Sequence, residues 1–380
     1  MFKARNYLLK IFYFICLLIA AIYCFKRPLY NWDILPYSYL ILKMDHYNSE
    51  DAYNLAYKSA KENIPSKEYH LLVDSSNAYR YRMSKDFNAF NEQLPFYVVK
   101  PLYTSLGYLF YKSGFSLIQA TLIPSFISYL LIGFLLFHWL KIYLQHSISF
   151  ITALLIMISS PLIEVAKLST PDCLSAFLLL CSFYFIVEKP SLRFAVLFMS
   201  LSVFARLDNI VTCFGLIGIM YASKKWYKKI PLRIFLLIII LFVCSYFLIS
   251  FFAYQYGWSI LFYNDFADHL HPAYGSMVHF SIQSYLRLMY EHVLSAINHS
   301  YVSIFLALLV FSFNEKLSLR NLSFDKMFLL LIPIILFVRL ILYPDVSDRL
   351  YIPFYLIIII LSAKRLASIQ LPVNVAGKIK

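Results

Sequence analysis

Long apolar runs separated by short polar turns dominate this chain. The first run covers residues 8–25 and leads directly into Lys26-Arg27-Pro28 without a small-residue cleavage site, which is typical of an uncleaved membrane span. Nine further apolar segments occur at about 117–140, 148–163, 171–187, 192–205, 209–222, 232–254, 301–313, 327–343 and 350–362. The pattern predicts an all-α polytopic membrane protein with about ten transmembrane segments.

Two polar regions interrupt this pattern. Residues 26–100 contain no run of spanning length, although 51–64 has helical character, and 255–300 ends in an amphipathic run typical of an interfacial helix. A second short interfacial helix is predicted at 101–112, where Pro suits the first helical position. No Gly/Ser-rich linker follows the first polar region, so we expect it to pack on the membrane bundle. The predicted parts are an anchor span at 1–25, a polar region at 26–100, a bundle with short helices at 101–254, a second polar region at 255–300, C-terminal spans at 301–363 and a basic tail at 364–380.

The composition indicates a lipid environment. Of the 380 residues, 61% are hydrophobic and 14% are charged, whereas a soluble domain carries about 25% charged residues. Thirty-five Phe and 32 Tyr residues suit a protein with extensive membrane interfaces. All six cysteines lie in apolar runs and no Cys-x-x-Cys pair occurs, so neither disulfides nor a zinc site is expected.

The net charge of +14 is explained by topology rather than by nucleic-acid binding. If the N-terminus is cytoplasmic and the ten segments alternate, the cytoplasmic pieces contain 18 of the 34 Lys and Arg residues but only three of the 20 acidic ones. This distribution follows the positive-inside rule. It predicts a multi-pass protein of the cell membrane with both termini cytoplasmic and both polar regions external, and short loops favour a bacterial inner membrane.

Under this topology, several ionisable residues collect at the external membrane face. An ionisable group near membrane depth costs about 2.5–3.5 kcal/mol on insertion scales, which makes each of them a functional candidate. Each also has a structural interpretation: a solvated loop acid, a helix cap, an ion pair between helices or a side chain that snorkels to the interface. The candidates are Asp33 and Asp51 after the first span, Asp172 in the sequence Ser169-Thr170-Pro171-Asp172, Arg206 and Asp208 between two short spans, Arg339 inside the next-to-last span, and Arg349 and Tyr351 before the last span.

One further group has the composition of a metal site. Asp265, Asp268, His269 and His271 lie close together in the second polar region. Two His residues at i and i+2 share a face on a strand but not on a helix. Such loose spacings are common by chance in polar loops, so no metal ligand is assigned, and a divalent metal remains an open alternative.

Several motifs resemble those of the GT-C superfamily of polytopic glycosyltransferases. An external acid follows the first span closely, and QLPFYVVKPLYTSLGYLFYKSGFS at 93–116 leads into the second. STPDCLSAFLLL at 169–180 and FARLDNIV at 204–211 resemble the short-helix segments of these proteins, and DRLYIPFYLIII at 348–359 resembles the start of their last span. The chain departs from the pattern in two respects, because Leu350 separates the Arg from the Tyr and no Asp-x-Asp follows the first span.

The resemblance, to bacterial mannosyl- and arabinosyltransferases in particular, implies a lipid-dependent sugar transfer. The donor would be a polyprenyl-phosphate sugar, the acceptor a lipid-linked or envelope glycan, and the reaction would occur at the external face of the bilayer. The resemblance implies no other cofactor, and a divalent metal is the alternative. The implied roles are catalytic base for Asp33 or, as the alternative, Asp51; phosphate binding for Arg206, Arg339 and Arg349; and substrate binding for Asp172, Asp208 and Tyr351.

Three other classes of function remain open at this point. A transporter or flippase of lipid-linked glycans would place its charges near the bilayer midplane and often shows two related halves, whereas here the charges gather at one face and no repeat is visible. A glycan polymerase or ligase fits two large external regions equally well. A non-catalytic scaffold could use residues 26–100 as a partner-binding surface.

Overall fold

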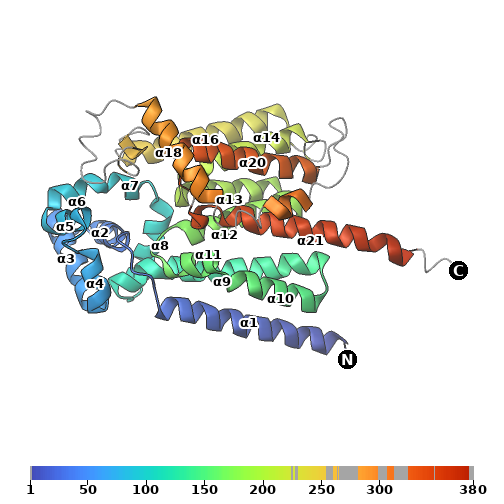
Figure 1. Cartoon of the computed structure of the whole chain (residues 1–380), viewed down its shortest axis with the longest axis horizontal. Helices are drawn as coiled ribbons and strands as arrows, with labels where there is room; N and C mark the ends of the chain where they lie inside the picture. The colour runs from blue at the N-terminus through green and yellow to red at the C-terminus, as the bar shows by residue number, and fades with distance from the viewer. Residues whose placement is uncertain are drawn as a thin grey trace.

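All regular structure in the described part of the chain is helical, and no strand occurs there. The computed structural model describes residues 2–223, 226, 230–253, 260–262, 264, 281–297, 306–311, 324–345 and 347–375. Long helices lie side by side in a bundle, and a group of short helices covers one end of it (Figure 1). The all-helical class predicted from the sequence is confirmed for these residues.

Four long helices contain stretches that are apolar enough to cross a membrane. They are α1 (Phe2–Lys26), α9 (Leu117–Tyr143), α16 (Leu232–Phe252) and α21 (Ile352–Val375). A fifth span results if α10 (His146–Met157) and α11 (Ser160–Lys167), which bend by 57°, are counted as one. These helices are consistent with a multi-pass membrane protein, but among the described residues only four or five of the ten predicted segments meet this test.

Shorter apolar helices complete the bundle. A helix of 14 residues extends about 21 Å, less than the bilayer's apolar core of about 30 Å. Successive short helices run in opposite directions, so every second turn between them lies at the same end of the bundle. These elements are α12 (Asp172–Val187), α13 (Leu192–Ala205), α14 (Asn209–Ala222) and α20 (Phe324–Leu342). The one-turn helix η3 (Asp348–Leu350), which carries an Asp and an Arg, precedes α21.

Helix α9 is the central element of the bundle. It contacts α1, α10, α11, α12 and α21, and it is apolar around its whole circumference, as expected for a helix surrounded by others. Tyr13 of α1 donates a hydrogen bond to the carbonyl of Gly133 at 2.9 Å. Gly133 permits this close approach, because a Cβ there would lie 2.6 Å from Leu17 Cδ1.

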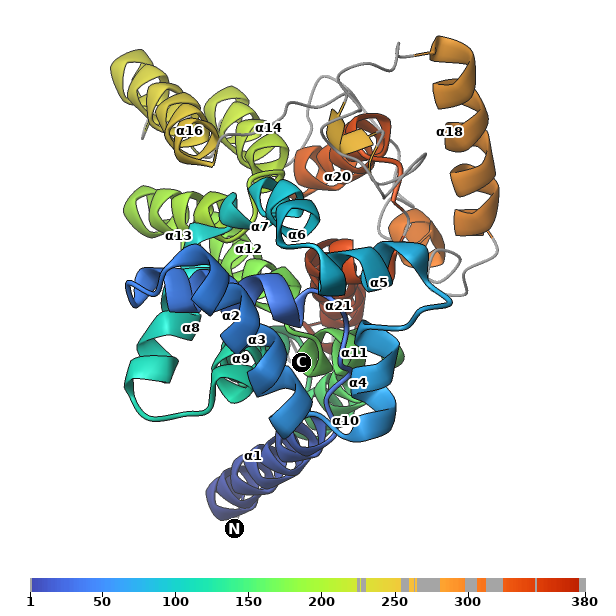
Figure 2. The same ribbon diagram turned by 90° about the vertical axis from the view of Figure 1, so that its left-hand side faces the viewer.

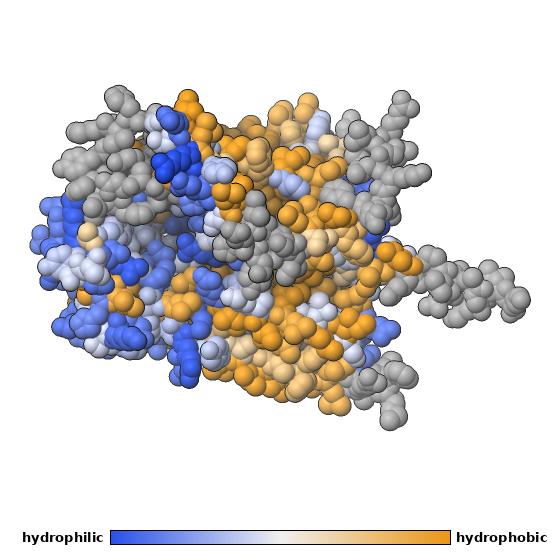
Figure 3. All heavy atoms as spheres, viewed as in Figure 1, coloured by the Kyte–Doolittle hydropathy of each residue, from blue (hydrophilic) through white to orange (hydrophobic). Residues whose placement is uncertain are grey.

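Residues 27–100, which we call the cap, fold into six short helices. Figure 2 views the molecule from this end, with the cap in front of the ends of the bundle helices. Figure 3 shows the hydrophilic surface of the cap beside the broad apolar surface of the bundle. The cap helices are α2 (Ile34–Met44), α3 (Ser49–Asn63), α4 (Ser66–Leu72), α5 (Ala78–Lys85), α6 (Phe87–Gln93) and α7 (Pro95–Val98).

The cap has its own core and packs on the bundle. Trp32, Tyr39 and Phe90 are buried in it together. Helix α2 contacts α9 and the adjoining helix α8 (Pro101–Lys112). Helices α3 and α8 agree with the predicted helical segments, and α18 (Ile282–Ile297) agrees with the predicted amphipathic helix. The buried helix α2 was not foreseen, because its apolar run is too short to signal a span.

Candidate functional site

The turns at the cap end of the bundle bring distant charged residues together. Helix α12 begins at Asp172, and the connection between α13 and α14 carries Arg206 and Asp208. Arg339 lies in the last turn of α20, and Arg349 lies in η3 just before α21. We call these five residues the arginine cluster.

Arg206 joins the two carboxylates of the arginine cluster. Its Nη1 donates to Asp172 Oδ1, and its Nε donates to Asp208 Oδ1 at 3.0 Å. Arg339 Nη2 donates to the second oxygen of Asp208. Arg349 is held more loosely, because its Nη1 lies 3.8 Å from Asp172 Oδ2. Four segments of the chain are therefore connected by one network of ion pairs.

The network keeps its acids ionised and leaves one arginine partly exposed. The Asp172 side chain is 2% exposed and that of Arg349 is 33% exposed. Although burial alone would raise it, the guanidiniums of Arg206 and Arg339 hold the pKa of Asp208 well below its ordinary value. The arginine cluster contains three guanidiniums and two carboxylates, and the carboxylates of Asp33 and Asp345 also act on Arg349. Because Asp172 and Asp208 are paired with arginines, the arginine cluster suits an anion at the loosely held Arg349 better than it suits a proton-accepting role for its own acids.

The space inside the arginine cluster is small. A cavity of about 10 Å³ lies among Asp172, Arg206, Arg339 and Arg349, with Ser175 and Leu350 also in its wall. This volume is about that needed for one water molecule. A sugar phosphate can enter only if side chains move, and Arg349 has the longest ion-pair distance and the greatest exposure among the three arginines.

Asp33 lies beside the arginine cluster, at the start of α2. Its Oδ1 accepts a hydrogen bond from the Tyr97 hydroxyl at 2.8 Å, and its Oδ2 accepts one from Asn31 Nδ2 at 2.5 Å. The carboxylate of Asp172, followed by those of Asp33 and Asp345, raises the pKa of Arg349 above its ordinary value. Asp33 is therefore close enough to act on the guanidinium that is held most loosely.

Two residues that the sequence did not single out connect Asp33 with the arginine cluster. The ammonium of Lys100 lies 5.0 Å from the centre of the Tyr97 ring and acts electrostatically on both Asp172 and Asp208. Burial, followed by the nearby Asp33 carboxylate, raises the pKa of Tyr97, which therefore remains a hydroxyl donor to Asp33. The available signal was Lys100 itself, a lone cation in the aromatic segment that precedes α8.

Tyr37 lies at the centre of this arrangement. Its ring is 5.4 Å from that of Tyr97, and its buried hydroxyl has no hydrogen-bond partner among the residues that the structure describes. Asp33, Asp172 and Arg206 all act electrostatically on this hydroxyl. An unpaired buried hydroxyl costs about 1–3 kcal/mol, which a bound polar ligand or an ordered water would offset.

Two other predicted site residues have different surroundings. Asp51 is exposed on the first turn of α3, where it exchanges hydrogen bonds with Asn48 and has no contact with the arginine cluster. Tyr351 donates to the carbonyl of Asp345 at 2.6 Å. Arg339 acts electrostatically on Tyr351, so this residue is at the edge of the arginine cluster.

The sequence also allowed purely structural roles for these residues, as ion pairs, helix caps or snorkelling side chains, and the structure shows some of these roles but not others. The ion pair between Arg206 and Asp208 is present, but Arg339 is buried and paired rather than snorkelling. Thr170 does not cap α12, because Pro171 occupies the N-cap position. Ser347 donates its hydroxyl to Asp345 instead of capping the last helix.

The described residues do not provide a ligand set for a metal ion. No group of three His, Cys, Asp or Glu side chains gathers in this part of the chain. Asp172 and Asp208 are occupied by arginines, and Asp33 by Tyr97 and Asn31. The group in the second polar region (Asp265, Asp268, His269 and His271) lies outside the described residues.

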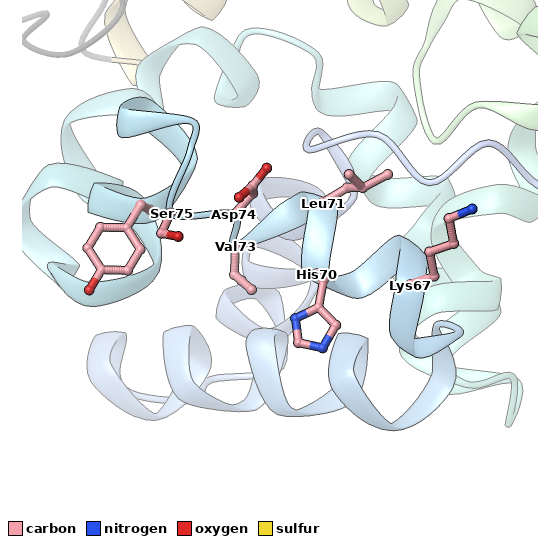
Figure 4. A pocket seen from close by; sticks show the side chains of 7 residues that line it. Lys67, His70, Leu71, Val73, Asp74 and Ser75 are labelled. Carbon is pink, nitrogen blue, oxygen red and sulfur yellow. The ribbon is translucent and has the colours of Figure 1, made fainter.

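A larger groove on the cap lacks convergent chemistry. Its volume is about 530 Å³, and its wall includes His70, Leu71, Asp74 and Tyr81. Figure 4 shows that His70 and Leu71 point in opposite directions. Both oxygens of Asp74 accept hydrogen bonds from Ser76, which lower the pKa of Asp74. The arginine cluster, with Asp33, is therefore the better candidate site.

Comparison of the chain with protein-family models, with curated proteins and with solved structures gives no match.

Proposed function

We propose that this chain is a membrane glycosyltransferase of the GT-C kind, which moves a sugar from a polyprenyl-phosphate donor to a lipid-linked or envelope glycan acceptor. The observation that carries the proposal is the arginine cluster at the junction of the cap and the apolar bundle, with Asp33 beside it. Such a junction suits a donor with a polyprenyl tail, a charged phosphate and a polar sugar. The tail would lie along the bundle, and the sugar would face the cap.

The proposed reaction uses Asp33 as the general base. Asp33 accepts the proton of a hydroxyl group on the acceptor, while the oxygen of that hydroxyl group forms a bond to C1 of the donor sugar. The bond between C1 and the phosphate oxygen breaks, its electron pair stays on that oxygen, and polyprenyl phosphate leaves. Arg349 and Arg206 stabilise the charge that grows on the leaving phosphate, and Asp33 then gives its proton to water.

Tyr97 and Lys100 support this chemistry. The Tyr97 hydroxyl donates a hydrogen bond to one oxygen of Asp33 and so fixes the orientation of the carboxylate. Because this donor is neutral, the carboxylate keeps its capacity to accept a proton. Lys100 adds a positive charge within reach of the arginine cluster. The donor would displace Arg349 from its loose pairing with Asp172, which would enlarge the small cavity.

The proposal includes the topology inferred from charge. Ten membrane segments would put both termini in the cytoplasm and the cap on the external face of a bacterial inner membrane. Helices α12, α13 and α14 would count among the short segments, whose turns at the cap end form the site.

The test is sugar transfer by membranes that contain the parent protein or a variant. A panel of labelled polyprenyl-phosphate hexoses and pentoses is offered, and product is scored after detergent solubilisation, where transport across a bilayer cannot contribute. We expect Asp33→Asn to reduce transfer at least 100-fold, which is the lower limit of the range for a general base (about 10²–10⁴). Arg349→Ala should also reduce it strongly.

Asp51→Asn is the matched control, because it is the same substitution on the same cap. It should leave transfer close to the parent value. If membranes with Asp33→Asn and membranes with Arg349→Ala both transfer sugar as well as the parent, the proposed site is wrong. If no donor in the panel supports transfer by the folded parent, the class of reaction is wrong.

A further inference from the structure

A second charged group lies at the end of the bundle that is far from the cap. It consists of Lys10 on α1, Lys141 near the end of α9 and Lys189 just after α12. Figure 1 shows this end of the bundle on the right, near the N-terminus. We call these three residues the lysine group.

Packing between α1 and α9 sets the level of two of the lysines. Tyr13 stacks on Phe137 with ring centres 4.3 Å apart. Lys10 lies one turn before Tyr13, and Lys141 lies one turn after Phe137 on a helix that runs in the opposite direction, so both lie at the same level. The Lys141 ammonium is 5.0 Å from the centre of the Phe137 ring.

The third lysine reaches the same place from α12. Lys189 Nζ is 5.9 Å from the centre of the Tyr184 ring. The Tyr184 hydroxyl is 3.3 Å from His138 Nε2, one turn before Lys141. All three lysines act electrostatically on His138, so their charges lie around the place where α1, α9 and the end of α12 come together.

Among the described residues, the nearby acids form no ion pair with the lysine group. Glu188 accepts hydrogen bonds from Trp139 Nε1 at 3.2 Å and from the Tyr143 hydroxyl. Asp325 pairs instead with Lys364, at 2.6 Å.

The positive-inside rule accounts for lysines in loops at this end, but not for three of them converging from three helices. Three like charges around one place repel one another unless an anion joins them. Lys141 lies near the end of a 27-residue helix, which at about 40 Å exceeds the bilayer's apolar core of about 30 Å. Tyr143 beside it is partly exposed and is a residue type that favours the headgroup level.

We propose that the lysine group binds the phosphate of an anionic phospholipid. The phosphodiester oxygens would accept hydrogen bonds from the three ammoniums, and the acyl chains would lie along the apolar faces of α1 and α9. Basic pockets between membrane helices are a known way to hold such headgroups. This proposal does not depend on the proposed enzymatic function.

The test measures binding of fluorescent phosphatidylglycerol and phosphatidylcholine to the purified full-length chain in neutral detergent. A lysine near an anionic lipid contributes about fivefold in affinity. The parent should therefore prefer phosphatidylglycerol by more than tenfold. The triple variant with Lys10→Gln, Lys141→Gln and Lys189→Gln should lose this preference, and the corresponding triple Lys→Arg variant should keep it.

The matched control changes the net charge equally, on the cap: Lys58→Gln, Lys61→Gln and Lys67→Gln together should retain the preference. Labelling of buried cysteines in each variant checks that it folds. The proposal is overturned if the first triple variant keeps the preference, or if the cap variant loses it to the same extent. It is also overturned if inorganic phosphate displaces the lipid while sulfate at equal ionic strength does not, because that result indicates a site for free phosphate.

Discussion

Removal of Arg206 should destabilise the bundle more than removal of any exposed arginine. Arg206→Met leaves Asp172, whose side chain is 2% exposed, with Arg349 at 3.8 Å as its remaining ion-pair partner. Breaking a buried ion pair by removing one partner costs about 3–5 kcal/mol. Because both carboxylates keep a second arginine, we expect a cost near 3 kcal/mol, which is about a 100-fold change in the unfolding equilibrium.

The buried cysteines of the chain provide the assay. A thiol-reactive fluorophore reports unfolding through Cys24, Cys173, Cys181 and Cys213, all of which are buried, while Cys16 and Cys244 set the baseline. Arg206→Met should lower the temperature of the labelling transition.

Two further variants make this result specific. Arg206→Met combined with Asp172→Asn should recover part of the loss, because the buried charge is removed with its partner. Arg287→Met is the control, because its pair with Glu291 is exposed and such pairs contribute about 0.3–0.5 kcal/mol. The reasoning is refuted if Arg206→Met melts like the parent, if it melts at a temperature no lower than that of Arg287→Met, or if the double variant is no more stable than the single one.

Three other predictions follow from particular contacts. Gly133→Ala should destabilise the chain by about 1 kcal/mol, because the new Cβ meets Leu17. Gly218→Ala has open space at its Cβ and should stabilise the chain by about 0.5–1 kcal/mol; the thiol-labelling assay measures both variants. If the proposed function holds, Tyr97→Phe should reduce the kcat of sugar transfer by about tenfold with little change in KM. The control Tyr103→Phe loses a hydrogen bond to a backbone carbonyl and should affect melting more than transfer. Equal effects of the two variants on kcat would contradict this. The pKa of Asp208 is lowered in the folded chain, so its ion pairs stabilise the fold at a pH above the ordinary Asp pKa of about 4, and this stabilisation is lost as the pH falls below that value. Asp208→Asn should therefore flatten the acid side of the profile of melting temperature against pH. An unchanged profile would contradict the assigned ion pairs.

The limits of individual helices could be predicted from the sequence better than the way in which the helices pack together. Pro101 and the apolar limits of α9, α12 and α13 were sufficient to place those helices within a few residues. The buried helix α2 escaped notice because its apolar run is far shorter than a bilayer span. Its burial depends on tertiary contacts with α8 and α9, which no local pattern records.

The candidate site was also predictable only in part, because a local pattern identifies neighbours in the sequence but not contacts between distant segments. Arg206 and Asp208 are neighbours in the chain, so their pairing could be inferred locally. Lys100 could not be connected with Asp172, because their proximity depends on how α8 packs against α9 and α13. Asp51 was the second candidate for the base after Asp33, but its place on the first turn of α3 gives it Asn48 as a partner and keeps it out of the arginine cluster.

The most direct test of the account is whether the arginine cluster binds a polyprenyl phosphate. Binding of polyprenyl phosphate and of uncharged polyprenol is compared for the purified parent and for Arg349→Ala, with the triple Lys→Gln variant of the lysine group as a control for the far end of the bundle. The account predicts that the parent and the control prefer the phosphate by at least tenfold and that Arg349→Ala loses most of this preference. Equal binding of the two lipids by the parent, or an undiminished preference in Arg349→Ala, would contradict it.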